Sequence, residues 1–368
     1  MTQLLYCPKG VFVSNGEVFI ADTDNHRVRK LLRNGQIVTI AGNEKGYYCD
    51  GQLATKSKLR TPHLVFVSSS NQVYFSEWLG NCIRKIDQRG MISTIAGTGE
   101  KGYNGDGQLA VDAKLNSPYG LFVTEDEEVL FADRGNNRVR KIDRNGIIST
   151  LAGNGKGEFN GDGQLATSAS LFCPTGVFQY KSEIYLTDTF NHRIRKIDHC
   201  GIVSTIAGTG IMGHGGDGKL ATDAAIGCPH SVFVHNDHIY LSDSTSSQIR
   251  EILPNGIITT IAGIGGKSGF NGDDMLATQC QLSTPFGIFV DNDSQVYIAD
   301  TSNQCIRKID QNGVMRRVVG TGQAGYSGDV PFDFEKFPHI GPPRKKQFLI
   351  KPFPHAYHDL IIIFETMD

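Results

Sequence analysis

The chain repeats a unit of roughly 55 residues, a period close to that of known repeat architectures, and this repeat constrains its fold more than any other feature of the sequence. A short apolar run that ends in an acidic residue recurs six times at nearly equal intervals. The acidic residues are Asp22, Glu77, Asp133, Asp188, Asp243 and Asp300. A fixed period of this kind is typical of architectures in which one unit cannot bury its own faces and must stack on its neighbours.

Each repeat contains four short runs of β-branched and apolar residues separated by turn signals. In the third repeat these runs are residues 119–123, 128–133, 138–142 and 147–153, and the turn Arg144-Asn145-Gly146 precedes the last of them. Runs of this length and composition predict strands. Four consecutive strands per unit predict an antiparallel blade, so six units predict an all-β, six-bladed β-propeller. We expect short helical turns in the linkers between blades.

The residues that follow the acidic position carry a family resemblance. The segments DTDNHRVRK (22–30), DRGNNRVRK (133–141) and DTFNHRIRK (188–196) resemble the NHL repeat. The resemblance covers roughly residues 5–329 and implies the six-bladed fold, so we assign residues 1–329 to the propeller. Residues 4–8 match the end of a linker and residues 320–329 match its beginning. We therefore expect the termini to divide a linker and each blade to own its four strands.

Residues 330–368 do not continue the repeat. They begin as a proline-rich linker and include one apolar run, YHDLIIIFE (357–365). This run weakly resembles the opening strand of a BTB/POZ-type interaction domain, and the alternative is a strand that docks on the propeller.

The composition of the chain disfavours some classes of binding partner. The formal net charge of -2, from 36 basic and 38 acidic residues, provides no general attraction to DNA or acidic membranes. No apolar run approaches the length of a membrane span, and the N-terminus lacks a signal-peptide pattern. The eight cysteines form no CxxC pair, and three of them share a repeat position that other copies fill with Thr or Ser. This usage predicts reduced thiols in a cytoplasmic protein.

The glycine-rich loop YNGDGQLAVDAKL (103–115) recurs in five linkers, which favours a scaffold role over five bound ions or phosphates. We interpret its aspartates as N-caps of one or two helical turns: Asp50, Asp106, Asp162, Asp217 and Asp273. The glycines of the same loop satisfy a dinucleotide-binding pattern, but no βαβ unit surrounds them. We expect no cofactor and no metal. The arginine repeated in every third strand is expected to form ion pairs within the scaffold.

Function is expected on one face of the ring. The linkers and the turns between second and third strands emerge at the same end of an antiparallel blade, and we call this end the linker-bearing face. Positions that differ between blades are better candidates than repeated ones, because a partner seldom shares the symmetry of the ring. The candidate binding residues on this face are Trp78, Glu77, Leu79, Phe190 and Gln248.

A second candidate set follows the proline that opens each innermost strand and is expected to rim the channel. Its members are Lys9, His63, Tyr119, Thr175, His230 and Phe286. They could hold a peptide or small ligand, or they could simply plug the channel. Two histidines invite comparison with metal-dependent propeller lyases and hydrolases, but the set offers no third ligand for a catalytic metal.

The sequence therefore predicts a non-catalytic binding scaffold whose partner is a protein bound on the linker-bearing face. RNA binding on the same face is the first alternative, because some NHL propellers bind single-stranded RNA, and a metal-dependent reaction in the channel is the second. Acidic residues lie among the basic ones on this face, namely Asp24, Glu77, Asp112 and Asp223. The face therefore lacks the uniformly positive surface that RNA binding favours. No DNA or membrane partner is expected.

Overall fold

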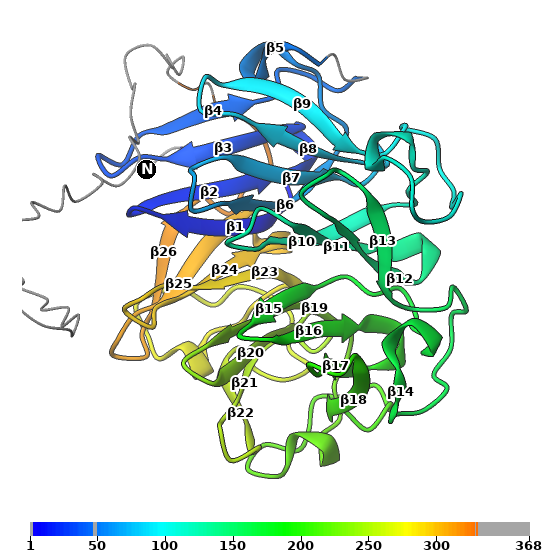
Figure 1. The fold of residues 1–368 in the computed structure, drawn as a ribbon. Helices are drawn as coiled ribbons and strands as arrows, with labels where there is room; N and C mark the ends of the chain where they lie inside the picture. The colour runs from blue at the N-terminus through cyan, green and yellow to red at the C-terminus, as the bar shows by residue number, and fades with distance from the viewer. Residues whose placement is uncertain (1–2, 47–49, 328, 330–368) are drawn as a thin grey trace, which may run out of the picture.

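The computed structural model describes residues 3–46, 50–327 and 329, and these residues form a six-bladed β-propeller (Figure 1). Each blade is an antiparallel sheet whose strands follow in chain order from the channel outward. The colours of Figure 1 run around the ring and bring the first blade, in blue, beside the last, in orange. The predicted fold is confirmed.

Blade 1 contains β1 (Pro8–Ser14), β2 (Glu17–Asp22), β3 (Arg27–Leu31) and β4 (Ile37–Ala41). Blade 2 contains β6 (Pro62–Val67), β7 (Val73–Glu77), β8 (Cys82–Ile86) and β9 (Met91–Ala96). Blade 3 contains β10 (Pro118–Val123), β11 (Val129–Asp133), β12 (Arg138–Ile142) and β13 (Ile148–Ala152).

Blade 4 contains β15 (Val177–Tyr180), β16 (Glu183–Asp188), β17 (Arg193–Ile197) and β18 (Ile202–Ala207). Blade 5 contains β19 (Pro229–His235), β20 (His238–Asp243), β21 (Gln248–Ile252) and β22 (Ile258–Ala262). Blade 6 contains β23 (Pro285–Val290), β24 (Val296–Asp300), β25 (Cys305–Ile309) and β26 (Met315–Val319).

Two further short strands lie in the linkers, and 3-10 turns are the only helical elements of the described residues. β5 (Gln52–Leu53) and β14 (Gln164–Leu165) each pair with the outermost strand of the blade that follows. The linker 3-10 turns are η2 (Ala54–Lys56), η3 (Ala110–Asp112), η5 (Ala166–Ser168), η7 (Ala221–Asp223) and η8 (Ala277–Gln279). The turns between second and third strands are η1 (Thr23–Asn25), η4 (Arg134–Asn136), η6 (Thr189–Asn191) and η9 (Thr301–Asn303). No described helix is long and apolar enough to cross a membrane.

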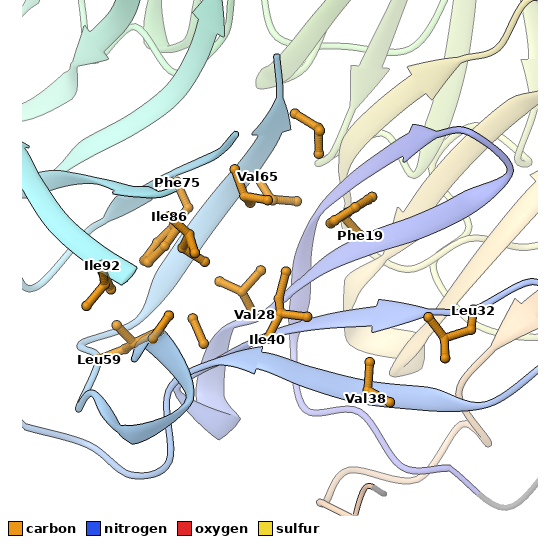
Figure 2. Packing of buried hydrophobic residues seen from close by; sticks show 14 residues of the cluster. Phe19, Val28, Leu32, Val38, Ile40, Leu59, Val65, Phe75, Ile86 and Ile92 are labelled. Atoms are coloured by element: carbon orange, nitrogen blue, oxygen red, sulfur yellow. The ribbon is translucent and has the colours of Figure 1, made fainter. Parts of the chain in front are cut away.

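The core lies between neighbouring blades. In Figure 2, Phe19, Val28 and Ile40 of blade 1 pack toward Val65 and Phe75 of blade 2. Both faces of a blade are covered in this way, so its first two strands are rich in apolar residues, whereas every third strand also carries an arginine. Six such clusters, one at each blade boundary, supply the apolar burial that holds the ring together.

The ring closes by the same packing. The cluster between blades 6 and 1 includes Leu5 and Ile20 from the N-terminal side and Tyr297 and Val319 from the C-terminal side. Leu5 forms a parallel bridge with Ala324, as Leu115 does with Lys101 inside an ordinary linker. The expectation that the termini divide a linker, and that no outer strand is borrowed, is confirmed.

Six arginines, one in the third strand of each blade, are fully buried. In five blades the guanidinium pairs with the acidic residue that ends the second strand, at 2.7–3.5 Å. The pairs are Arg29–Asp22, Arg84–Glu77, Arg140–Asp133, Arg195–Asp188 and Arg307–Asp300. The expected scaffold role of these arginines is confirmed, because a buried charge needs a partner.

The capping interpretation of the linker aspartates is wrong. The residue before each linker 3-10 turn is a leucine, for example Leu109 before η3, and no side chain caps the turn. The aspartate lies three residues earlier and pairs with the buried arginine of the following blade at 2.7–2.9 Å. The pairs are Asp50–Arg84, Asp106–Arg140, Asp162–Arg195, Asp217–Arg250 and Asp273–Arg307. Each aspartate therefore joins a linker to the next blade.

The seven described cysteines are unpaired: Cys7, Cys82, Cys173, Cys200, Cys228, Cys280 and Cys305. The apolar run at 357–365, with its BTB/POZ resemblance, lies outside the described residues. The assignment of residues 330–368 as a separate linker and strand stays a prediction.

Candidate binding site at the channel mouth

The linker-bearing face is defined by strand pairing. Pro8, which opens β1, pairs with Asp22 at the end of β2. The start of the innermost strand and the turn after the second strand therefore lie at the same end of the blade, and the linkers arrive there too.

All of the large apolar side chains that are exposed among the described residues belong to linkers or to these turns. They are Tyr6, Leu79, Tyr103, Leu109, Val111, Phe159, Leu165, Phe172, Phe190, Ile211, Met212, Leu220, Phe270, Leu276 and Tyr326. The short turns at the opposite end contribute none of them. Apolar exposure is therefore confined to the linkers and to the turns between second and third strands.

Some of these exposed side chains recur in most linkers and belong to the scaffold. Tyr103 stacks on Arg138 at 3.9 Å, and the equivalent Phe159 and Tyr326 stack on the equivalent arginines at 3.8 and 4.0 Å. Phe270 instead lies 4.8 Å from Arg317 of the fourth strand. Four of the leucines recur at one linker position beside the outer strand of the next blade. Seven exposed side chains do not follow the repeat, and they are Tyr6, Leu79, Val111, Phe172, Phe190, Ile211 and Met212.

The residues expected to rim the channel come together as one cluster. His63 lies against Tyr119, with ring centroids 4.4 Å apart, and His230 lies 4.3 Å from Phe286. The Lys9 Nζ atom lies 3.4 Å from His63 Nε2 and 4.9 Å from the Phe286 ring centroid. Thr175 differs from the others, because it is fully buried and its hydroxyl contacts that of Thr189 at 2.7 Å.

A closed ring of six phenylalanines lies further along the channel. Each blade gives one of them, and neighbouring ring centroids are 4.4–5.2 Å apart all the way around. The ring consists of Phe12, Phe66, Phe122, Phe178, Phe233 and Phe289. The sequence analysis missed it, although the signal was present as a phenylalanine three residues after every rim position.

The channel interior is too small for an organic ligand. The cavity bounded by these phenylalanines, Thr175 and His230 measures about 40 Å³, which is room for one or two water molecules. Among residues 3–46, 50–327 and 329, no three His, Cys, Asp or Glu side chains gather closely enough to hold a metal ion. An organic ligand of the channel would therefore bind at its mouth and not inside it.

Burial and neighbouring charge keep the rim histidines neutral. Burial, followed by repulsion from Lys9 and Arg134, holds the pKa of His63 well below its usual value. Burial likewise lowers the pKa of His230 to about 4, even though its Nδ1 lies 2.9 Å from the carbonyl oxygen of Cys228. Burial also lowers the pKa of Lys9, against the attraction of Asp24. The mouth therefore carries its positive charge on Lys9 and Arg134.

The candidate residues of the face divide into two groups. Leu79 and Phe190 are exposed, and Trp78 is half-buried beside the channel cluster, with its ring 5.2 Å from that of His63. The prediction that Glu77 and Gln248 are binding residues is wrong. Glu77 is fully buried in its ion pair with Arg84, and Gln248 is 5% exposed and donates to Thr260 Oγ1 at 2.9 Å. Neither side chain is available to a partner.

Arg134 was missed by the sequence analysis. It opens η4 and acts electrostatically on Lys9, His63, Tyr119 and His230. In its own segment it resembles an ordinary surface arginine. Comparison of the six turns would have found it, because four blades carry Thr or Ser at this position and only blades 2 and 3 carry large side chains.

Fold, repeat chemistry and channel define a class of protein, a six-bladed β-propeller of NHL repeats. The NHL repeat model matches residues 5–31, and the teneurin NHL domain model matches residues 99–159 and 265–332. The chain therefore contains NHL repeats and is similar to the teneurin NHL domain over the matched residues.

Curated relatives agree with this assignment. The protein SUPPRESSOR OF QUENCHING 1, chloroplastic, of Arabidopsis thaliana is 28% identical over 316 residues, which cover 81% of this chain and 29% of the relative. Teneurin-m of Drosophila melanogaster is 27% identical over 332 residues, covering 80% of this chain and 12% of the relative. The chain thus spans less than a third of the length of these relatives.

Solved structures share the fold at low identity. A virginiamycin B lyase from Staphylococcus aureus superposes with a TM-score of 0.51 at 17% identity, covering 86% of each chain. An auxiliary nutrient binding protein from Bacteroides thetaiotaomicron gives 0.60 at 15% identity, covering 86% of this chain and 70% of the other. A gluconolactonase from Xanthomonas campestris gives 0.55 at 13% identity, covering 86% and 87%. These identities support a shared architecture and no shared chemistry.

Proposed function

We propose that the protein is a non-catalytic binding propeller that recognises a protein partner through its linker-bearing face. The observation that carries the proposal is the confinement of exposed apolar side chains to the linkers and to the turns between second and third strands. Exposed apolar surface on a rigid scaffold is typical of interaction sites.

The asymmetry of the exposed residues supports the same proposal. The side chains that do not follow the repeat include Leu79 of blade 2 and the Phe172–Phe190 pair, whose ring centroids are 5.3 Å apart. Ile211 and Met212, in the linker between blades 4 and 5, are 70% and 63% exposed. An apolar surface that differs from blade to blade suits one partner in one orientation. The interspersed carboxylates of this face favour protein over RNA.

The test is affinity capture with a matched pair of variants. Leu79→Ser/Phe190→Ser/Met212→Ser removes apolar surface from the linker-bearing face. Arg144→Ser/Lys181→Ser alters two exposed residues in turns at the opposite end. We expect a protein that survives nuclease treatment to be retained by wild type and the control, and lost by the triple variant. Capture that disappears with nuclease, or that the triple variant retains, would overturn the proposal.

A further inference from the structure

Blades 2 and 3 lack a hydrogen bond by which each of the other four blades is joined to the next blade at the channel mouth. In four blades, a Thr or Ser hydroxyl at the start of the turn after the second strand donates to the carbonyl oxygen of the proline that opens the next blade. The pairs are Thr23–Pro62, Thr189–Pro229, Ser244–Pro285 and Thr301–Pro8. Trp78 and Arg134 occupy this position in the two remaining blades. These adjacent blades replace an inter-blade bond with two large side chains.

Two cations at this mouth have no carboxylate partner. Among the described residues, neither Lys9 nor Arg134 has an acidic oxygen within 4.0 Å. The nearby carboxylate that attracts Lys9 is that of Asp24, which is exposed and forms no ion pair with it. Other half-buried cations also lack a carboxylate, for example Arg138 and Arg193, but their guanidinium groups donate to backbone carbonyl oxygens. Partly desolvated positive charge without a partner favours an anionic ligand.

The neutral groups of the mouth also present donors. Because an ammonium group can only donate, His63 Nε2 accepts from Lys9 and the ring proton lies on Nδ1. This Nδ1 atom and Trp78 Nε1 are both buried and have no hydrogen-bond partner among the described residues. A buried donor without an acceptor destabilises a structure. A ligand that supplies acceptor oxygens would remove this cost.

The surroundings of these donors are aromatic. Tyr119 and Phe286 lie beside Lys9 and His63, and Phe190 lies 5.6 Å from the Arg134 guanidinium. Aromatic walls around a cationic pair suit a carboxylate that is attached to an apolar group. They suit a strongly hydrated inorganic anion less well.

We propose that Lys9, Arg134, Trp78 and His63 form a site that binds a carboxylate of a peptide next to an apolar side chain. The carboxylate belongs to a chain terminus or to a Glu or Asp side chain. The proposal deepens the binding function by naming what the partner presents to the channel mouth, and it rests on that function only for the choice of face.

The test uses four short peptides and the full chain. N-acetyl-Gly-Phe and N-acetyl-Phe-Glu-Phe-amide carry the two kinds of carboxylate, while N-acetyl-Gly-Phe-amide and N-acetyl-Phe-Gln-Phe-amide are their neutral counterparts. Affinity is measured by calorimetry. Trp78 is the only tryptophan in the sequence, so its fluorescence reports whether binding occurs at the mouth.

We expect at least one carboxylate to bind at least tenfold more tightly than its amide and to change the fluorescence of Trp78. Lys9→Met/Arg134→Met should weaken this binding at least tenfold, and Arg144→Met/Lys181→Met should leave it unchanged. Arg134→Thr, which introduces a residue that other blades already carry, guards against misfolding and should weaken binding too.

Equal affinity for carboxylates and amides would overturn the proposal, as would undiminished binding by the double variant. Binding of oligouridine RNA or inorganic phosphate without carboxylate binding would overturn it as well. Because the peptides are tested directly, a failed capture experiment beside positive peptide binding would remove the proposed protein partner and leave this site in place.

Discussion

The ion pair between Asp106 and Arg140 provides a sharp test of how the linkers are attached. Arg140 is fully buried, and its Nη2 atom contacts Asp106 Oδ1 at 2.8 Å and the Gly105 carbonyl oxygen at 2.6 Å. The Asp106 side chain is 35% exposed. A hydrogen bond to a charged group contributes about 1.5–3 kcal/mol, and exposure favours the lower half of that range.

We expect Asp106→Ser to lower the free energy of unfolding by about 2 kcal/mol. Serine is as good an N-cap as aspartate, so a capping role would predict a change near zero for the same substitution. The measurement is urea unfolding followed by circular dichroism. Asp112→Ser, at an exposed aspartate in the same linker, is the matched control and should change the stability by less than about 0.5 kcal/mol.

A double-mutant cycle with Arg140→Met completes the test. If the carboxylate acts through the guanidinium, Asp106→Ser should cost little once Arg140 is replaced. A cost of about 2 kcal/mol that persists in the Arg140→Met background would refute the assigned pairing. A single variant as stable as wild type would refute it too.

Three further predictions concern the mouth and the closure of the ring. Arg134→Thr should raise the free energy of unfolding by about 1 kcal/mol, because it restores an inter-blade hydrogen bond, while it weakens carboxylate binding. Unfolded His230 takes up a proton as the pH falls through 6.5, whereas the folded group resists until about 4. Wild type should therefore lose about 2 kcal/mol more stability than His230→Gln between pH 7.5 and pH 5. Leu5→Ala should cost about 2–5 kcal/mol, and Leu115→Ala, at the equivalent fully buried position, should cost a similar amount.

Each of these predictions has a result that contradicts it. A destabilised Arg134→Thr variant would show that the arginine itself holds the two blades together. Parallel pH profiles for wild type and His230→Gln would show that the histidine titrates normally in the folded protein. A Leu5→Ala cost far below that of Leu115→Ala would mean that blades 1 and 6 are joined more weakly than the other pairs.

The repeat predicted the fold because its information is local. Period, strand pattern and turn residues all lie within one unit, and the unit then recurs. The function of Asp106 was misjudged for the opposite reason, because its partner Arg140 lies in the third strand of the following blade and the nearby helical turn offered a plausible local explanation. Burial of Glu77 and Gln248 likewise depends on residues distant in sequence, Arg84 and the Arg60 backbone for Glu77 and Thr260 for Gln248.

Only some residues of the candidate site could be predicted from the sequence. Lys9, His63 and Trp78 were found because they follow a proline or break the repeat. Arg134 was not, because its meaning appears only when it is compared with Thr23, Thr189 and Thr301, whose hydroxyls reach the next blade. Which side chains lack partners cannot be read from a sequence, since partners come from the folded ring.

The phenylalanine ring blocks the passage of organic ligands along the channel from one face to the other. Its six side chains touch in a closed circle, so a peptide group that enters at the linker-bearing face must leave by the same route. A ligand bound at one face therefore cannot pass through the axis to the other, so the two faces of the disk can bind separate partners.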